Sequence, residues 1–539
     1  MQRRDFLSRL SLAMGVAFAS RSALAQQGAT KSILDYGANP DGKSLSTRAI
    51  QRAIDEVSHA GGGIVHAPAG RFLIGGLELK SRVTLYLDEG CTLLGSTSID
   101  DYESHPSTKG FHVLFAQNAE DVALGGPGTI DGQGPAFWEK SDRVPPLPQD
   151  AWKDVATHYV QVKKGRQRPS PMIEFAQCKN VNVSGVTLKF SAGWTIRSAA
   201  CEKVNIDGIH IRNPFFGINT DGIDIAASND VQISNCDILT GDDAVVLKSA
   251  NPYGEPRPTK NIKVTNCKMT TSCNGFKIGT ETSGAFESIS FSNSFVYSDP
   301  ANPLNTHVIA GIALEMVDGG SIDGVTISNI RMQNVRTPIF VRLEQRKRSD
   351  ASFLRDVSID GVEASGAIVT SSITGIPGLR PSDITVSNSH IRTVEQGKRD
   401  WVHRDIPEEP DHYPEAWMLG HLPAYGFYVR HGDRVQLRNV EIIPDKPDAR
   451  PAIVCDDVND VTLSGLQLAA PVDDAPLIEL RNTTKALLTG MHSPAGVKVF
   501  AEISGGKSSG IALKGNTLDA GQQAVAYTHG AADGSAQVE

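Results

Sequence analysis

Aromatic and basic residues are both scarce in this sequence. Phe, Trp and Tyr make up 6% of its 539 residues, and 52 Lys and Arg stand against 61 Asp and Glu, which gives a formal net charge of −9. Nucleic-acid binding needs basic patches that match phosphate charge, so this composition argues against it. Glycine is abundant instead, with 51 residues. Many tight turns and few bulky rings favour a repetitive solenoid over a β-sandwich.

Cysteine pairs are also missing. The seven cysteines form an odd set scattered between Cys91 and Cys455, and no CxxC pair has partner histidines. This pattern predicts neither a disulfide framework nor a zinc site. We therefore expect reduced, buried cysteines, and neither a metal nor another cofactor.

Long hydrophobic runs are absent too. No segment approaches the roughly 18 uninterrupted apolar residues of a membrane span, so we expect no membrane association once a signal is removed. Residues 1–25 follow the order of a secretory signal, with Arg3-Arg4, an apolar stretch and then Ala23-Leu24-Ala25. The arginine pair predicts twin-arginine export, and the small residues Ala23-Leu24-Ala25 predict cleavage before Gln26. We expect the mature protein to be a monomer in the periplasm or outside the cell.

One short pattern recurs ten times and predicts the fold. Each unit alternates polar and aliphatic residues and ends in Asn or Gly, as in NVNVSG at 180–185 and DVQISN at 230–235. Alternation predicts a short half-buried strand, and Asn or Gly tolerates the left-handed backbone of a corner. Such repeats at variable spacing predict an all-β protein, a right-handed parallel β-helix. The other units begin at Lys203, Asn261, Ser288, Gly324, Asp356, Asp383, Arg434 and Asp460.

Residues 26–539 are predicted to form one β-helix catalytic domain, of which 26–80 are the N-terminal cap and first coil. Apolar residues recur at helical spacing between Ser46 and His59, which predicts a short helix over the open end of the solenoid. Residues 394–433 form an aromatic, Pro-rich insertion, either an ordered loop beside the substrate groove or a packing loop. The Gly- and Ser-rich tail after about residue 505 is predicted to be mobile.

Two acidic motifs carry the predicted chemistry. Asn219-Thr220-Asp221-Gly222 and Gly241-Asp242-Asp243 are separated by about one coil of the repeat. Residues one coil apart stack about 4.7–4.9 Å apart, so three carboxylates should share one face. Their repulsion should raise at least one pKa, which suits a general acid at neutral pH. A single Asp beside Gly would be a turn residue, but two motifs in register predict a catalytic site.

These motifs resemble the polygalacturonase-type enzymes of glycoside hydrolase family 28. The likeness runs from about Ile33 to at least Arg346. It is carried by DYGANPDG at 35–42, GGGIVHAPAG at 61–70, GTIDGQG at 128–134, SAGWT at 191–195, NTDGID at 219–224 and TGDDAVVLKS at 240–249.

The resemblance implies inverting hydrolysis of a glycosidic bond in a pectin-related or other plant polysaccharide or oligosaccharide. Asp242 then matches the general acid, and Asp221 and Asp243 match the residues that activate the water. In inverting enzymes the acid and base lie about 6.5–9.5 Å apart, which leaves room for that water. Asn219 and Lys248 are expected to contact the sugar, although Lys248 equally fits a solvated side chain over the solenoid.

Departures from the family pattern surround the aspartates. Asn274 stands where the family carries a His between two glycines. Ala313 and Glu315 stand where the family binds the uronate carboxylate with Arg-x-Lys. A Glu would repel a carboxylate, so we expect weak action on plain polygalacturonate, and exo-action on a neutral or modified sugar.

Other charged residues near the acids are candidate substrate ligands. Lys277 and Glu281 follow Asn274 on the same coil. Lys277 would receive an anionic group or, equally, pair with Glu315. Arg342, on a neighbouring coil, is a weaker candidate, and for all of these a surface salt bridge is the plain alternative.

Two other functions fit part of the sequence. A β-helix polysaccharide lyase would hold calcium on an acidic cluster such as the three aspartates, but it also needs a basic residue, and no second basic motif stands out. A lyase leaves unsaturated products that absorb ultraviolet light, whereas a hydrolase does not. A non-catalytic glycan-binding solenoid would bind without turnover, and Asp242→Asn would leave its binding intact.

Overall fold

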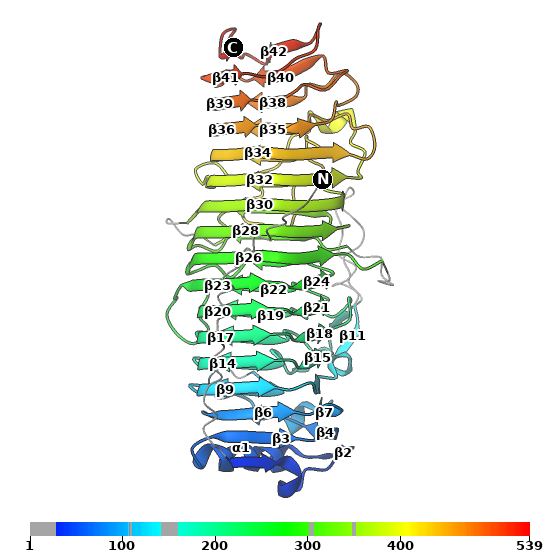
Figure 1. Ribbon diagram of the computed structural model, residues 1–539, viewed down its shortest axis with the longest axis vertical. Helices are drawn as coiled ribbons and strands as arrows, with labels where there is room; N and C mark the ends of the chain where they lie inside the picture. Colours follow the sequence, from blue (N-terminus) through cyan, green and yellow to red (C-terminus); the bar gives the residue numbers. More distant parts are fainter. Residues whose placement is uncertain (1–28, 106, 108–109, 142–159, 301–306, 348–351) are drawn as a thin grey trace, which may run out of the picture.

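Each of the ten repeat units is a strand in one parallel sheet of 26 strands. The computed structural model describes residues 29–539 except 106, 108–109, 142–159, 301–306 and 348–351, so the predicted signal at 1–25 lies outside the described residues. The strands stack along the molecule (Figure 1) in the order β14 (Lys179–Ser184), β17 (Glu202–Asp207), β20 (Asn229–Ser234), β23 (Thr259–Thr265), β26 (Ala285–Tyr297), β28 (Ser321–Gln333), β30 (Phe353–Ala367), β32 (Ser382–Thr393), β34 (Asp433–Pro444) and β36 (Asn459–Ser464).

Left-handed residues mark both ends of each unit. The predicted corner residues all have positive φ, from 48° at Asn388 to 72° at Gly185. The residue that opens each unit is left-handed as well, for example Lys203 with φ 56°, which the pattern did not predict. Corner asparagines also stack, since Asn329 Nδ2 donates to Asn293 Oδ1 at 2.8 Å. The predicted corners are therefore confirmed.

Five of the units belong to longer strands than predicted. β26, β28, β30, β32 and β34 have 12 to 15 residues and run through the corner. In β26 and β28, Ser292 pairs with Ser328 and Ser294 pairs with Ile330, so the ladder resumes at once beyond the corner asparagines. The expectation of short strands throughout is wrong here, because neighbouring coils keep their register on both sides of the corner.

A second parallel sheet, of 15 strands, carries the acidic motifs. Alternate residues of its strands point into the core, as Ile223 and Ile225 do, while Asp224 between them points outward. Burying one such aliphatic side chain contributes about 1.5–3 kcal/mol. Its strands are β5 (Leu77–Glu78), β8 (Leu114–Gln117), β13 (Ile173–Ala176), β16 (Ile196–Ala199), β19 (Ile223–Ala226), β22 (Val245–Lys248), β25 (Phe276–Ile278), β27 (Ala310–Met316), β29 (Thr337–Leu343), β31 (Ser371–Thr374), β33 (Phe427–Arg430), β35 (Ile453–Asp456), β38 (Ile478–Arg481), β40 (Val499–Ser504) and β42 (Gln523–Thr528).

Together the two sheets form a right-handed parallel β-helix, as predicted. Helix α1 (Thr47–His59) covers its first coil and buries the predicted apolar face, and Gly61, with φ 98°, follows its end. The seven cysteines are free and buried, which confirms that prediction. In the described part of the chain, no helix has the length and apolar character to cross a membrane.

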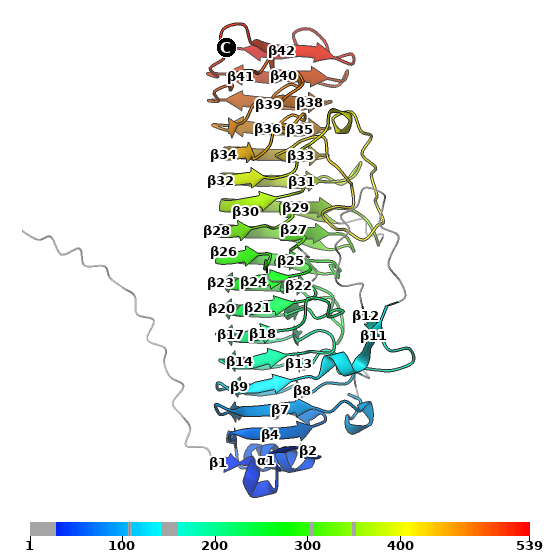
Figure 2. The same ribbon diagram turned by 90° about the vertical axis from the view of Figure 1, so that its right-hand side faces the viewer.

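The insertion is shorter than the predicted 394–433. β32 ends at Thr393, and β33 (Phe427–Arg430) already belongs to the second sheet, so the insertion loop comprises residues 394–426. The predicted bound was wrong because the interval between first-sheet units also contains each coil's second-sheet strand. Figure 2 shows this loop, in yellow, alongside the later coils.

The C-terminal tail continues the solenoid. β41 (Ile511–Lys514) pairs with β43 (Ala536–Val538), and β42 pairs with β40. The predicted mobile tail is wrong, because Ile511 and Leu513 alternate with polar residues and are each 1% exposed. The glycines and serines of this segment supply its turns.

Candidate active site

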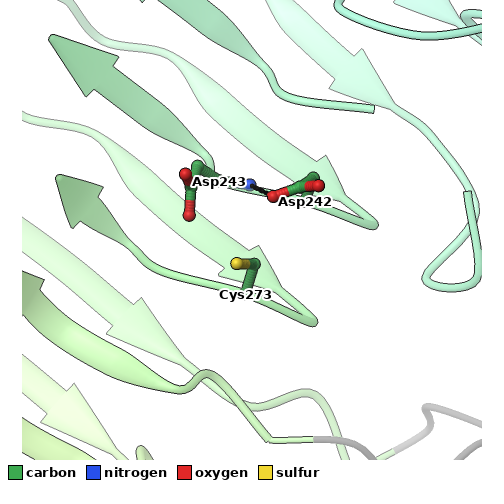
Figure 3. Close-up of side chains that lie close together, drawn as sticks. All are labelled: Asp242, Asp243 and Cys273. Atoms are coloured by element: carbon green, nitrogen blue, oxygen red, sulfur yellow. Dashed lines mark hydrogen bonds between the residues drawn. The ribbon is translucent and has the colours of Figure 1, made fainter. Parts of the chain in front are cut away.

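The two acidic motifs precede neighbouring strands of the second sheet, β19 and β22. Ile223 pairs with Val245, and the backbone N–H of Gly222 donates to the carbonyl of Asp243 at 2.9 Å. Asp221 and Asp243 therefore hold equivalent places on adjacent coils, as the spacing predicted. Figure 3 shows Asp242 beside Asp243, with Cys273 on the next coil.

Asp242 is the half-buried member of the three, whereas Asp221 and Asp243 are each 4% exposed. One of its carboxylate oxygens accepts from the backbone N–H of Asp243 at 2.9 Å. Burial raises the pKa of Asp242, and the charge of Asp243 adds to this rise. Asp242 thus combines solvent access with a carboxyl that holds its proton above the usual pH range.

Asp243 is held ionised. Burial by itself would raise its pKa, but Lys277 and hydrogen bonds from Cys273 and Asn274 outweigh burial and hold the pKa of Asp243 below its usual value. Lys277 Nζ lies 3.3 Å from one carboxylate oxygen. The backbone N–H and side-chain amide of Asn274 donate to the other oxygen at 3.1 and 2.9 Å.

Asp221 has the opposite environment. Burial raises its pKa well above the usual value, and the charge of Asp242 raises it further, while Lys248 offsets part of the shift. Its Oδ1 is buried with no hydrogen-bond partner. Burial is the largest cause of the raised pKa at both Asp221 and Asp242, and the predicted repulsion between neighbouring carboxylates adds to it.

Lys277 and Glu315 form a buried ion pair beneath the acids. Lys277 is 1% exposed and Glu315 is 0% exposed, and Nζ lies 3.3 Å from Oε2. This confirms the pairing alternative for Lys277. The same ammonium donates to the hydroxyl of Tyr413, in the insertion loop, at 3.4 Å. The ammonium of Lys277 is therefore shared between two ion pairs, with Asp243 and Glu315, and one hydrogen bond, to Tyr413, while both oxygens of Glu315 are buried without a hydrogen-bond partner.

Asn219 and Lys248, the two expected sugar contacts, lie near Asp221. Asn219 is exposed, and its side-chain oxygen accepts from Arg168 at 3.1 Å. Lys248 Nζ lies 3.4 Å from Asp224 and 3.5 Å from Glu281, whose side chain is 42% exposed. Asn219 and Glu281 bring polar groups to the surface near the acids, whereas Lys248 is 7% exposed, so the alternative of a solvated Lys248 is wrong.

Trp194 provides an aromatic surface at this side. Ile196 pairs with Ile223, which places Trp194 one coil from Asp221 in the same register. Its half-buried ring lies 4.3 Å from Lys248 Nζ, measured to the ring centroid. Flat apolar rings are typical surfaces for sugar binding.

Asn274 and Arg342 are buried, at 0% and 1% exposure. Asn274 positions Asp243, and its side-chain oxygen accepts from the backbone N–H of Ala310 at 3.1 Å. Arg342 donates to Glu344 at 2.7 Å and to the carbonyl of Glu408 at 2.5 Å. Arg342 therefore anchors the insertion loop to β29.

Sequence reasoning missed four polar residues of this site: Arg168, Asp224, Cys273 and Glu415. Alternation with Ile223 and Ile225 was a usable signal for Asp224, whose pKa burial raises to about 7. Arg168 and Glu415 come from loops, where no periodicity marks a functional residue.

A metal ion bound at Asp242 and Asp243 would compete with Lys277. One ligand atom each of Asp242, Asp243 and Cys273 lie within 4.8 Å of one another, so the nearest oxygens of Asp242 and Asp243 are closer than the distance of about 6.5–9.5 Å expected between acid and base. Lys277 already neutralises Asp243, and burial raises the pKa of the Cys273 thiol well above its usual value, so the sulfur keeps its proton. The arrangement suits proton transfer between carboxyls and substrate.

Known proteins share both the sequence and the fold. The family described as "Glycosyl hydrolases family 28" matches residues 63–404. A "Probable polygalacturonase" from Vitis vinifera is 24% identical over 457 residues, which span 77% of this chain and 87% of the relative. An "Endo-polygalacturonase" from Pectobacterium carotovorum subsp. carotovorum is 27% identical over 361 residues, 64% of this chain and 84% of the relative. The solved exopolygalacturonase from Thermotoga maritima has the same fold, with a TM-score of 0.60 and 23% identity over 77% of this chain and 92% of its own.

Proposed function

The chain belongs to glycosyl hydrolases family 28, and on that basis we propose that it is an exo-acting, inverting hydrolase of a pectin-related or other plant glycan. The family membership makes it a glycosidase, so the lyase and non-catalytic alternatives fall away. One observation carries the finer assignment: the structure separates an accessible carboxyl of raised pKa, Asp242, from an ionised one, Asp243. Paired carboxyls with divided pKa values are what acid–base cleavage requires.

In the proposed reaction Asp242 donates its proton to the glycosidic oxygen as the bond from that oxygen to the anomeric carbon breaks. A water attacks the opposite face of that carbon and loses a proton to Asp243, so the configuration inverts. Burial raises the pKa of Asp221 well above its usual value, and its buried, unpartnered Oδ1 orients the water. Acid and base catalysis of this kind typically contribute about 10²–10⁴-fold each.

The insertion loop supports the exo mode. Arg342 anchors this loop to β29. Ala416 and Trp417 of the loop pack against Cys273 in the turn before β25, Ala313 on β27 and Phe340 on β29. The loop therefore covers the outer face of the second sheet on the side of the later coils (Figure 2). A glycan chain bound at Asp242 would meet this loop, which favours cleavage at a chain end. The named relatives include both endo- and exo-acting enzymes, so their names do not decide the mode.

The test is a screen of pectic and hemicellulosic oligosaccharides with product stereochemistry followed by NMR. We expect one class to be cleaved from its end with an inverted anomer as the first product, and plain polygalacturonate to release little or no galacturonate. The low activity follows because Ala313 and Glu315 replace the expected carboxylate ligands, and Glu315 is paired with Lys277. A retained anomer, or robust release of galacturonate, would contradict this proposal.

We also propose export through the twin-arginine route. The support is Arg3-Arg4 followed by an apolar stretch and Ala23-Leu24-Ala25. In a bacterial host with this route, the exported protein should begin at Gln26, as read by N-terminal sequencing. Arg3→Lys with Arg4→Lys should leave the full-length chain inside the cell, and unchanged export of that variant would argue for another route.

A further inference from the structure

Glu415 projects from the insertion loop at the edge of the acidic site. Its neighbour Ala416 packs in one apolar cluster with Cys273 and Ala313, and Tyr413 lies against Lys277. Residues on both sides of Glu415 therefore contact the catalytic coils. These contacts fix the position of the loop. They place Glu415 beside residues that are more than a hundred positions away in the sequence.

Glu415 has unused hydrogen-bonding capacity. The side chain is half-buried, and its Oε2 is buried without a hydrogen-bond partner. Burial raises the pKa of Glu415 to about 8, with Lys277 opposing the shift and the charges of Asp243 and Asp242 adding to it. Near neutral pH such a carboxyl keeps its proton, so it offers a hydroxyl donor and a carbonyl acceptor. A sugar hydroxyl can pair with both.

The cation that lies against the insertion loop is already paired. Lys277, 1% exposed, lies 3.3 Å from a carboxylate oxygen of Asp243 and 3.3 Å from one of Glu315, and it donates to the hydroxyl of Tyr413. Ala313 is fully buried beneath the insertion loop. An incoming carboxylate would displace one of these partners and lie close to several acidic groups, which costs binding free energy.

We propose that Glu415 is a substrate-binding residue that selects a neutral, hydroxyl-bearing sugar over a uronate at the cleavage subsite. This inference rests on the proposed glycosidase function and names its substrate class. The insertion loop replaces the cationic carboxylate site that the family motif would build with a carboxyl that binds hydroxyl groups.

The first experiment uses 4-nitrophenyl glycosides, both anomers, of galactose, rhamnose, xylose and galacturonic acid. We expect the wild type to favour a neutral glycoside over the galacturonide by about 10-fold or more in kcat/KM. Glu415→Ala should raise KM for that neutral glycoside by about 10-fold with a smaller change in kcat, because it removes both the donor and the acceptor of the carboxyl. Asp411→Ala, in the same loop and with a side chain that is 75% exposed, is the matched control and should leave KM unchanged.

A second measurement needs no variant. Free galactose, rhamnose and xylose are compared with free galacturonate as competitive inhibitors of the wild type, and the best neutral sugar should inhibit at a lower concentration than galacturonate. Preference for galacturonate in either assay, or a Glu415→Ala variant that matches Asp411→Ala, overturns the inference while hydrolysis stands. A wild type that cleaves none of these glycosides and no pectic or hemicellulosic glycan overturns the proposed function itself.

Discussion

Asp242→Asn is expected to lower kcat on the natural glycan by about 10²–10⁴-fold, the contribution of a general acid. The amide cannot protonate the glycosidic oxygen, whereas its size and its acceptor for the backbone N–H of Asp243 are retained. Steady-state kinetics at the optimum pH, with substrate in excess, measure the loss. Turnover near that of the wild type would refute the assignment of Asp242.

Leaving-group dependence separates the acid from the base. A 4-nitrophenolate departs with little help from a proton, so Asp242→Asn should lose less activity on a 4-nitrophenyl glycoside than on the glycan. Asp243→Asn removes the base and should lose similar activity on both substrates. Asp237→Asn, in the same coil but on the first sheet, breaks only a surface ion pair with Arg212 and serves as the control. Equal losses on both substrates in the Asp242 variant would contradict its role as the acid.

Lys277→Met is expected to lower the free energy of unfolding by about 3–5 kcal/mol, because it leaves buried charge without a partner. Lys277 is 1% exposed and pairs with both Asp243 and Glu315. Urea unfolding at pH 7, followed by circular dichroism, measures the change. Lys260→Met removes an exposed ion pair with Glu287 and should cost at most about 1 kcal/mol. Equal stability of the two variants would exclude a buried, charged Lys277.

The same variant should also shift the pH dependence of activity. Lys277 holds the pKa of Asp243 below its usual value. The ionised Asp243 therefore stabilises the fold at pH values above its unfolded pKa, and this stabilisation is lost as the pH falls through its folded pKa. Without the ammonium, the pKa of Asp243 rises, and the base is ionised only at higher pH. The acidic limb of the kcat/KM profile should therefore move to higher pH in Lys277→Met, and an unmoved limb would argue that Asp243 is not the base.

Local patterning explains how much of the fold was predictable. Alternation and Asn or Gly corners identified ten of the 26 strands of the first sheet, because they reflect rules that act over a few residues. The ends of strands that depend on pairing with neighbouring coils were not predicted. Strands such as β30 run on because their partners do, and the tail is ordered because β39 (Thr484–Thr489) offers β41 an edge to pair with.

The proximity of Asp221 to Asp242 and Asp243 was predictable because one coil of the solenoid converts sequence spacing into spatial register. Their division of labour was not, since it depends on Lys277 beneath Asp243 and on solvent reaching Asp242. Lys277 itself was visible in the sequence, but its choice between a substrate anion and Glu315 was settled only by burial.

The sequence by itself determined the β-helix, the family and the common register of the three candidate aspartates, because each follows from short-range patterns repeated along the chain. Tertiary structure alone decided which residues complete the site. Tyr413 reaches Lys277 across more than a hundred residues of chain, and Glu415 follows it in a loop packed on β27 and β29. Long-range packing and the desolvation that comes with it leave no local signature, and they set the charge of every group in the site.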